Sequence, residues 1–258
     1  MKSIAVFDSG IGGITFLREA WRHLPAEHFI YFADTEKVPY GTRRTEEVRR
    51  LVNEAVEFLS RKNIKALVIA CNTATSAAVY ELRQRYDFPI LGMEPAIKPA
   101  LQYAVDKRVL VFSTSLTSQG GKLHMLCNQL DRNQQVDTEP FDELVKSAEA
   151  FDFVSPNVKN IIRRKLSLVD LNAYGAVVLG CTHFIFYRPL IEEILPSSVR
   201  VFDGNRGTLN NLIKTLHGNP ASAQGSRGQI LFFSSGHPES LEREQMLLKL
   251  VRDQRADL

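Results

Sequence analysis

The chain has 258 residues, 44% of them hydrophobic, and is long enough to bury one large core or two ordinary ones without disulfides. Its 32 lysines and arginines are spread along the sequence among 29 acidic residues, and a net charge of +3 excludes the concentrated basic surface of a nucleic-acid-binding protein. No apolar stretch approaches the roughly 20 residues of a membrane span, so we expect no membrane anchor, no export signal and a cytoplasmic location.

Short apolar, β-branched runs recur along the chain, and most are followed by a turn and a stretch with helical periodicity. In order, the runs are residues 3–7, 28–32, 66–70, 89–93, 108–113, 176–180, 200–202 and 229–233. Several of them lack polar alternation, which is typical of strands covered by helices on both faces. The pattern predicts an α/β fold with mostly parallel sheets.

Polar and nucleophilic residues follow these predicted strands. Ligands of open parallel sheets bind beyond the carboxyl ends of the strands, where the chain leaves for a helix. The residues at these positions are Asp8, Ser9, Asp34, Cys71, Ser113, Thr114 and Cys181. We therefore expect a small-molecule site at these strand ends.

Two look-alike segments each contain one of the chain's three cysteines. "ALVIACNTA" (66–74) contains Cys71, and "AVVLGCTHF" (176–184) contains Cys181. The repeat predicts two similar open α/β domains, with the active site in the cleft between them and both sulfurs facing it. We place residues 1–97 plus 208–258 in the domain of Cys71, and residues 98–207 in that of Cys181.

Each of these cysteines ends a strand and begins a helix, where the helix dipole and free N–H groups favour a thiolate. A thiolate in a cleft serves as a nucleophile, metal ligand or base. A matched pair favours proton chemistry, in which one thiol removes a proton and the other delivers one. His183 and Asp8 are the candidate helpers that tune the two thiols. Cys127, inside a helical pattern, is interpreted as a core residue.

Two alternatives of other classes remain. A single-cysteine hydrolase or lyase acting on a small acidic substrate would need only one reactive thiol, and a small-acid binding protein would need none. Asn72-Thr73 and Thr182-His183 would supply donors at helix starts to a carboxylate in any of the three cases.

The sequence gives no sign of a cofactor or a metal. The cysteines lack metal-ligand spacing, and "DSGIGG" (8–13) matches no phosphate-binding loop. Pyridoxal phosphate requires a Schiff-base lysine, and Lys37, before the turn "VPYG", has no phosphate cradle beside it. We expect neither a cofactor nor a metal.

Six segments together resemble one family over nearly the whole chain. "FDSGIGG", "YFADTEKVPYG", "ACNTAT", "GMEPA", "LGCTH" and "FFSSGHPES" are similar to segments of the glutamate racemases in the aspartate/glutamate racemase family. The resemblance implies cofactor-independent, two-base interconversion of L- and D-glutamate, which supplies D-glutamate for peptidoglycan. It also implies a homodimer with glutamate as substrate, and aspartate racemase is the nearest alternative.

The resemblance also implies residue roles. Cys71 corresponds to the base acting on the D-isomer, assisted by Asp8, and Cys181 to the base acting on the L-isomer, assisted by His183. The positions that hold the substrate's amino and carboxylate groups are Ser9, Pro39, Tyr40, Gly41, Asn72, Thr73, Thr114, Thr117 and Thr182.

The sequence departs from the family's pattern at three places. Glu139-Pro140 stands where Cys-Pro is usual, with Glu149 as the candidate acidic helper that follows. Phe184-Ile185 replaces Tyr-Pro after "CTH", and residues 204–211 lack the usual small residues. Some relatives are activated by a cell-wall precursor through an N-terminal extension. Because the DSG motif begins at residue 8, we expect no such dependence here.

Overall fold

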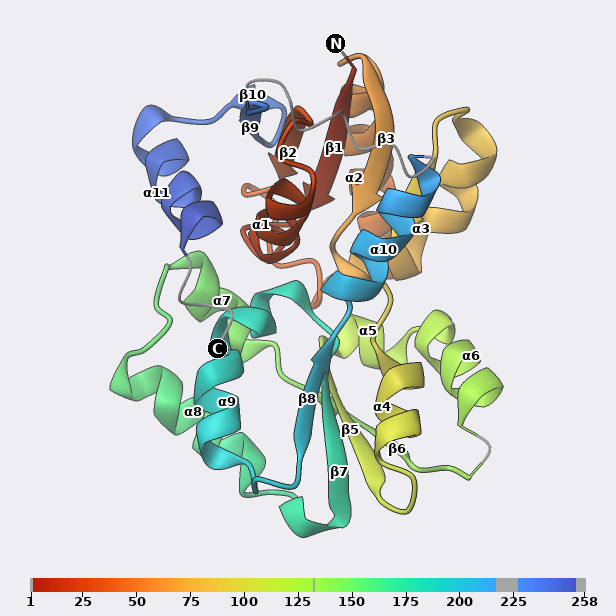
Figure 1. The fold of residues 1–258 in the computed structure, drawn as a ribbon, viewed down its shortest axis with the longest axis vertical. Helices are drawn as coiled ribbons and strands as arrows, with labels where there is room; N and C mark the ends of the chain where they lie inside the picture. The colour runs from red at the N-terminus through yellow and green to blue at the C-terminus, as the bar shows by residue number, and fades with distance from the viewer. Residues whose placement is uncertain (1, 132, 217–226, 254–258) are drawn as a thin grey trace.

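The computed structural model describes residues 2–131, 133–216 and 227–253, and its strands form two sheets (Figure 1). The first has six strands in the order β10-β9-β2-β1-β3-β4, and the second has four in the order β6-β5-β7-β8. Neighbouring strands are parallel throughout, except for the antiparallel pair β9 and β10. The predicted α/β fold with mostly parallel sheets is confirmed.

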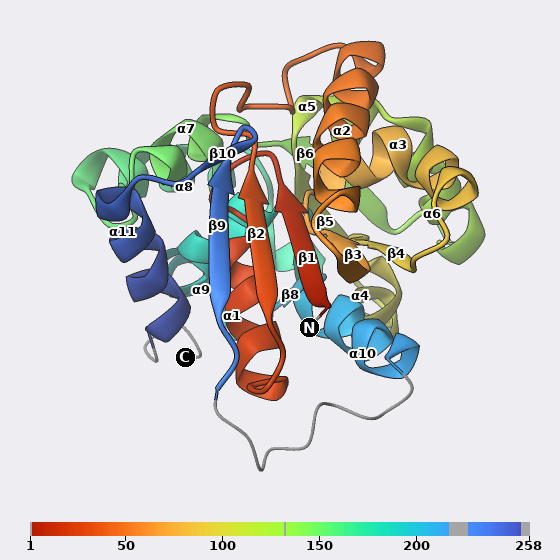
Figure 2. The same cartoon turned by 90° about the horizontal axis from the view of Figure 1, so that it is seen from above.

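The first sheet and the helices packed on it are called the first unit. Its strands are β1 (Ser3–Asp8), β2 (Phe29–Ala33), β3 (Ile64–Ile69), β4 (Ile90–Gly92), β9 (Ile230–Ser234) and β10 (His237–Pro238). Its helices are α1 (Ile14–His23), α2 (Thr45–Ser60), α3 (Asn72–Arg85), α10 (Asn205–Thr215) and α11 (Leu241–Arg252). Figure 2 shows α1 on one face of this sheet, α2 and α3 on the other, and α11 beside the β9 edge.

The second unit is built on the second sheet. Its strands are β5 (Arg108–Ser113), β6 (Val136–Pro140), β7 (Tyr174–Leu179) and β8 (Arg200–Asp203). Its helices are α4 (Ile97–Tyr103), α5 (Ser115–Gln119), α6 (Gly121–Leu130), α7 (Glu143–Glu149), α8 (Pro156–Leu166), α9 (Arg188–Ile194) and the short 3-10 helices η1 (Leu171–Ala173) and η2 (Thr182–Tyr187).

Two strands were not predicted from the sequence. The residues of β6 are all only partly buried and include Asp137 and Glu139, so this edge strand lacks the apolar run used to find the others. The other is β10, a two-residue exposed strand closing the hairpin with β9. The domain boundaries near residues 97 and 208 stay predictions, although α10 already packs against α1 and β4 of the first unit.

Alternation along the central strands divides each core into two layers. Ile4 and Val6 of β1 face the helices α1, α10 and α11, whereas Ala5 and Phe7 face α2 and α3. In the second unit, Val109 and Val111 of β5 face α4 and α6. Leu110 and Phe112, on the opposite side of the sheet, pack against α7, α8 and α9. Both sheets are therefore covered on both faces, as their apolar strands require.

The register of the strands brings their carboxyl ends together. Asp8 pairs with Ala33 and Phe7 with Ile69, so β1, β2 and β3 end side by side. In the second sheet, Phe112 pairs with Leu179, which aligns the ends of β5 and β7. Figure 1 shows β1 running from the outer end of the first unit toward the second. The residues that follow these strands consequently meet between the two units.

The length and hydrophobicity of the helices decide whether any of them could span a membrane. Within the described ranges, none is both long and apolar enough to cross a membrane.

Candidate active site

Cys71 lies at the start of α3, as the sequence predicts. Its Sγ accepts a hydrogen bond from the backbone N–H of Ala74 at 3.4 Å, and Ser9 Oγ lies 3.6 Å away. The residue is buried, with 6% of its surface exposed. The thiol is thus held at a helix N-terminus of the first unit.

The expectation that this position favours a thiolate is wrong for Cys71. Burial raises the pKa of its thiol to about 12, with a further rise from the charge of Asp8, and these outweigh the hydrogen bonds from Ala74 and Ser9. Desolvation disfavours the charged form more than one weak N–H contact favours it. Cys71 therefore carries its proton at neutral pH.

Asp8 joins the two units. The carboxylate, which is fully buried at the end of β1, accepts hydrogen bonds from Gly10 N–H and from Thr182 Oγ1, both at 2.9 Å. Burial raises the pKa of this carboxyl to about 6, although the charge of His183 and the two hydrogen bonds oppose the rise. At neutral pH Asp8 is mostly an anion between the two cysteine segments.

Cys181 and His183 lie on the second unit. Cys181 begins the 3-10 helix η2 rather than an α-helix, and its side chain caps no backbone N–H, unlike the capping sulfur of Cys71. Its Sγ is 3.8 Å from Nδ1 of His183, whose ring is buried. Burial acts to lower the pKa of His183, but the contacts with Cys181 and Glu149 raise it well above its ordinary value. The imidazole is therefore suited to carry a positive charge beside the sulfur.

Glu149, at the end of α7, is the acidic partner of His183. Its Oε1 lies 2.7 Å from His183 Nε2 and accepts the backbone N–H of Ile11, also at 2.7 Å. Burial acts to raise the pKa of Glu149, but His183, Ile11 N–H and Arg243 together lower it below its usual range. The candidate acidic helper is thus placed at the histidine despite the altered residues that precede it.

The segment "DSGIGG" passes closely against the second unit. A Cβ on Gly10 would collide with the carboxyl of Glu149, and one on Gly12 would lie 2.6 Å from His183 Nδ1 and 2.8 Å from its backbone nitrogen. Only glycine permits this approach. The glycines therefore allow the two units to pack closely. This role is separate from phosphate binding, for which the segment has no matching motif.

Three threonines form a second link between the units. Thr73 Oγ1 lies 3.0 Å from both Thr114 Oγ1 and Thr117 Oγ1, which are 2.9 Å from each other. All three are buried. Gly41 packs against Thr114, where a side chain would collide. These hydroxyl groups come from the ends of β3 and β5 and are grouped as a polar ligand would require.

Asn72 and Tyr40 differ in what they offer a ligand. Among the described residues, the buried Oδ1 of Asn72 has no hydrogen-bond partner, whereas its Nδ2 contacts Met93 O at 3.5 Å. An unpaired buried acceptor is costly and suits a ligand amino group. The hydroxyl of Tyr40, which follows Pro39 in the turn, donates instead to Asp34 at 2.6 Å. The structure therefore directs the tyrosine hydroxyl to Asp34.

Sequence reasoning missed several residues of this region. Asp34 was expected only as a strand-end residue, yet it accepts hydrogen bonds from Tyr40 and from Ser235 of the β9–β10 turn, the latter at 2.7 Å. Tyr31 donates to Gly10 O at 2.6 Å, and Arg243 of α11 reaches Glu149. No local motif marks these residues, because apart from Tyr40, six residues after Asp34, their partners are distant in sequence.

Two of the departures from the family's pattern are held by contacts within the second unit. Glu139 forms an ion pair with Lys165 rather than contacting His183. Phe184 is buried against the ring of Phe141 at 5.8 Å between centroids. Phe184, which follows "CTH", thus packs into the hydrophobic core of the second unit.

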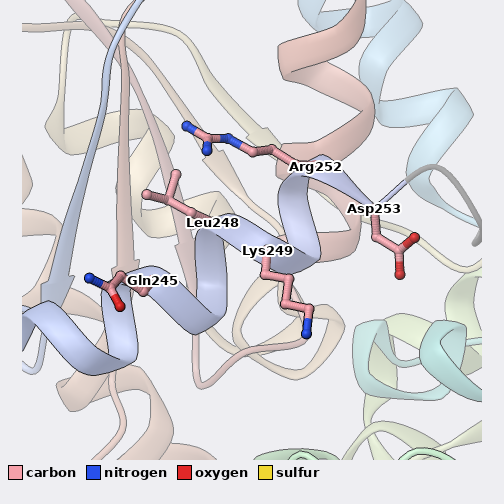
Figure 3. A pocket seen from close by; sticks show the side chains of 5 residues that line it. All are labelled: Gln245, Leu248, Lys249, Arg252 and Asp253. Atoms are coloured by element: carbon pink, nitrogen blue, oxygen red, sulfur yellow. The ribbon is translucent and has the colours of Figure 1, made fainter.

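A surface cavity of about 680 Å³ lies elsewhere, along α11 (Figure 3). Its described lining residues, none of them a candidate residue, are Gln245, Leu248, Lys249, Arg252 and Asp253. The candidate site is instead a buried cluster between the units, with Cys181 only 7% exposed.

Comparison with known proteins identifies the family. A family model described as Asp/Glu/Hydantoin racemase matches residues 15–211, a range that contains both cysteines. The chain belongs to the Asp/Glu/Hydantoin racemase family. Within this racemase family, a glutamate racemase from Halothermothrix orenii is 44% identical over 246 residues, covering 95% of this chain and 97% of that protein.

Solved structures of racemases share the fold. A glutamate racemase isoform from Bacillus anthracis matches with a TM-score of 0.83 at 28% identity, covering 96% of this chain and 92% of that chain. The Escherichia coli glutamate racemase, in complex with L-glutamate and the activator UDP-MurNAc-ala, matches with a TM-score of 0.79 at 27% identity, covering 96% of both chains. The racemase fold therefore extends over nearly the whole chain.

The close approach of Gly12 predicts a functional cost for a single methyl group. Gly12→Ala should lower the unfolding free energy by about 1–3 kcal/mol through overpacking. It should also reduce kcat about tenfold to a hundredfold, because the Thr182-His183 backbone must move away. Gly121→Ala is the matched control, since a Cβ there meets no atom within 4 Å. Equal behaviour of the two variants in denaturation and turnover assays would contradict the assigned contact.

The raised pKa of Asp8 predicts a stability that depends on pH. Between pH 3.8 and about 6, the folded protein retains a proton that the unfolded chain has released, so this carboxyl's stabilising contribution is complete below 3.8 and lost as the pH rises through 6. Asp8→Asn removes the ionisation. Relative to the wild type, the variant should gain up to about 3 kcal/mol of unfolding free energy between pH 4 and pH 8. Urea denaturation at both pH values tests this, and a difference that does not change with pH would contradict it.

Proposed function

We propose that this chain interconverts L- and D-glutamate by a two-base mechanism without a cofactor, with Cys71 and Cys181 as the two bases. The observation that carries the proposal is the placement of two free, buried cysteines on facing units, each with its own ionisable helper. The 44% identity to a glutamate racemase over almost the full chain supports glutamate rather than aspartate as the substrate.

A protonated Cys71 and a histidine beside Cys181 suit the start of the L-to-D reaction. Cys71 holds its proton because of burial and the nearby Asp8. Cys181 lies beside His183, which can take up the Cys181 proton as an imidazolium. The Cys181 thiolate would then remove the α-proton from one face of L-glutamate, and the Cys71 thiol would deliver its proton to the other. The D-isomer leaves Cys71 as the thiolate and Cys181 as the thiol.

The helpers lower the cost of these charges. Glu149 holds His183 from the side opposite Cys181, so an imidazolium there is balanced by a buried carboxylate. Asp8 stabilises the protonated form of Cys71, and its bond from Thr182 links it to the opposite segment. The α-proton is a weak acid, so both transfers need sulfur and carbon held in fixed geometry.

The polar groups around the cysteines suit an amino acid. The unpaired Oδ1 of Asn72 can accept the substrate's ammonium group, and the hydroxyls of Thr73, Thr114 and Thr117 can donate to a carboxylate. Gly41 packs against Thr114, while Ser9 lies beside Cys71 and Thr182 donates to Asp8. Pro39 and Tyr40 are proposed to contribute through the shape of their turn, because the hydroxyl of the tyrosine is engaged by Asp34.

The wider setting is proposed from family membership. A homodimer, a cytoplasmic location and a supply of D-glutamate to peptidoglycan are consistent with the racemase family. The division of the chain near residues 97 and 208 is proposed from the two sheets and from the packing of α10 on the first unit.

A single assay separates this proposal from its rivals. Purified protein is incubated with L-glutamate or L-aspartate without added cofactor, and the change in optical rotation is followed. Loss of rotation with glutamate supports the proposal, whereas loss with aspartate alone supports aspartate racemase. No change with either substrate would favour the single-cysteine hydrolase or lyase, or a binding protein.

The two-base mechanism predicts the fate of the α-proton. In deuterated water, product formed early from either isomer should carry deuterium at the α-carbon, while unreacted substrate stays protonated, because the returning thiol has exchanged with solvent. Cys71→Ala and Cys181→Ala should each lower racemisation by roughly three orders of magnitude or more, since the pair acts as one unit. Proton NMR and polarimetry measure both effects. Rapid racemisation by either variant, or equal deuterium in substrate and product, would indicate a single base.

A mechanism without a cofactor predicts that the activity survives treatments that remove metals and pyridoxal phosphate. Activity should be unchanged after exhaustive dialysis against a chelator and hydroxylamine, because no residue has been assigned to a metal or to pyridoxal phosphate. Turnover before and after dialysis is the measurement. Activity that disappears and returns on addition of pyridoxal phosphate or a divalent metal would overturn the mechanism.

A further inference from the structure

Arg243, in the first turn of α11, reaches the site from outside the two cysteine segments. Its Nη2 lies 3.5 Å from Glu149 Oε2, and its Nε lies 3.3 Å from Oε2 of Glu239, which directly precedes the N-cap of α11. The guanidinium also lies 5.5 Å from the ring centroid of Phe151, just beyond α7. Its side chain is 28% exposed and that of Glu149 is 15% exposed. The pair is therefore largely withdrawn from water, where ion pairing is stronger than at an open surface.

The two oxygens of Glu149 have separate partners. Oε1 accepts Ile11 N–H and faces His183 Nε2, both at 2.7 Å, whereas Oε2 faces Arg243. A carboxylate held on both oxygens has a fixed orientation. Among the described residues, Arg243 is the cation that faces Oε2, so without it the carboxylate could turn away from the histidine.

Arg243 also joins the units. Helix α11 packs on α1 of the first unit, and α7, which ends at Glu149, packs on η2 of the second. Figure 1 shows α11 directly above α7 across the gap between the two sheets. The arginine thus connects the C-terminal helix with the histidine that contacts Cys181.

We propose that Arg243 is a positioning residue for the Cys181 half of the reaction, acting through Glu149 to hold the imidazolium of His183 beside the sulfur. The proposal rests on the proposed roles of Cys181 and His183. Arg243 itself is assigned no contact with substrate. Its charge adds to the interactions that keep Glu149 anionic, in agreement with the lowered pKa of that carboxyl, which burial alone would raise.

A double-mutant cycle tests this route of action. Arg243→Met should lower kcat about tenfold in both directions, with KM changed less than about twofold, because it weakens chemistry rather than binding. In a Glu149→Gln background, the same substitution should have almost no further effect on kcat, since the carboxylate it acts on is gone. Arg243→Lys should restore most of the lost rate by returning the positive charge. Initial rates from L- and D-glutamate supply all of these values.

The matched control is Arg252→Met at the other end of α11, which should leave kcat and thermal stability unchanged (Figure 3). If Arg243→Met does not fold, Arg243→Gln is measured in both backgrounds. Additive effects of the Arg243 and Glu149 substitutions, a wild-type kcat in the neutral variants, or a failure of lysine to restore the rate would overturn the proposal. If Cys181→Ala and His183→Asn keep full activity in the same assay, the two-base function fails instead.

Discussion

Burial of charge between two sets of strand ends is the constraint on which the site depends. Asp8, Glu149 and His183 all lie where parallel strands finish and water is largely excluded. A buried charge is tolerated only when it is paired and hydrogen-bonded. Asp8 and Glu149 each find a partner on the opposite unit, Asp8 in Thr182 and Glu149 in the backbone of Ile11, and His183 is paired with Glu149. The electrostatics of the site therefore require the two units to be in contact.

The glycines after β1 make that contact possible. Gly10 and Gly12 let the backbone lie directly against Glu149 and His183, where any residue with a Cβ would collide. The backbone N–H groups of this loop can therefore donate to the carboxylates of Asp8 and Glu149. The loop that begins at Asp8 thus contributes a carboxylate, a backbone donor and space for the second unit within a few residues. The same short segment therefore provides both the close packing of the two units and the hydrogen bonds to the buried carboxylates.

The two cysteines are alike in sequence but differ in their surroundings. Cys71 caps an α-helix and has a carboxylate as its charged neighbour, which favours the thiol. Cys181 begins a 3-10 helix and has a histidine as its neighbour, which can accept a proton. In a racemase, the two enantiomers of the substrate have equal free energy in solution, but the enzyme groups that meet them need not be equivalent. The two thiols therefore have unlike ionisable neighbours, so the site is asymmetric although its two sequence motifs are alike.

The sequence alone determined the parallel α/β architecture, because buried strands require apolar runs that repeat with intervening helices. It also located Cys71, Cys181, Asp8 and His183, because strand ends in such sheets carry the reactive side chains. It missed β6, whose residues are polar at an edge, and misjudged the thiol of Cys71, because burial is a property of the assembled units. Only the tertiary structure decided that Glu149 meets His183, that Asp34 holds Tyr40, and that Arg243 reaches Glu149. The pairings of Glu149 with His183 and of Arg243 with Glu149 join segments far apart in the chain, whereas Asp34 and Tyr40 are only six residues apart. All three contacts depend on packing that no local pattern records.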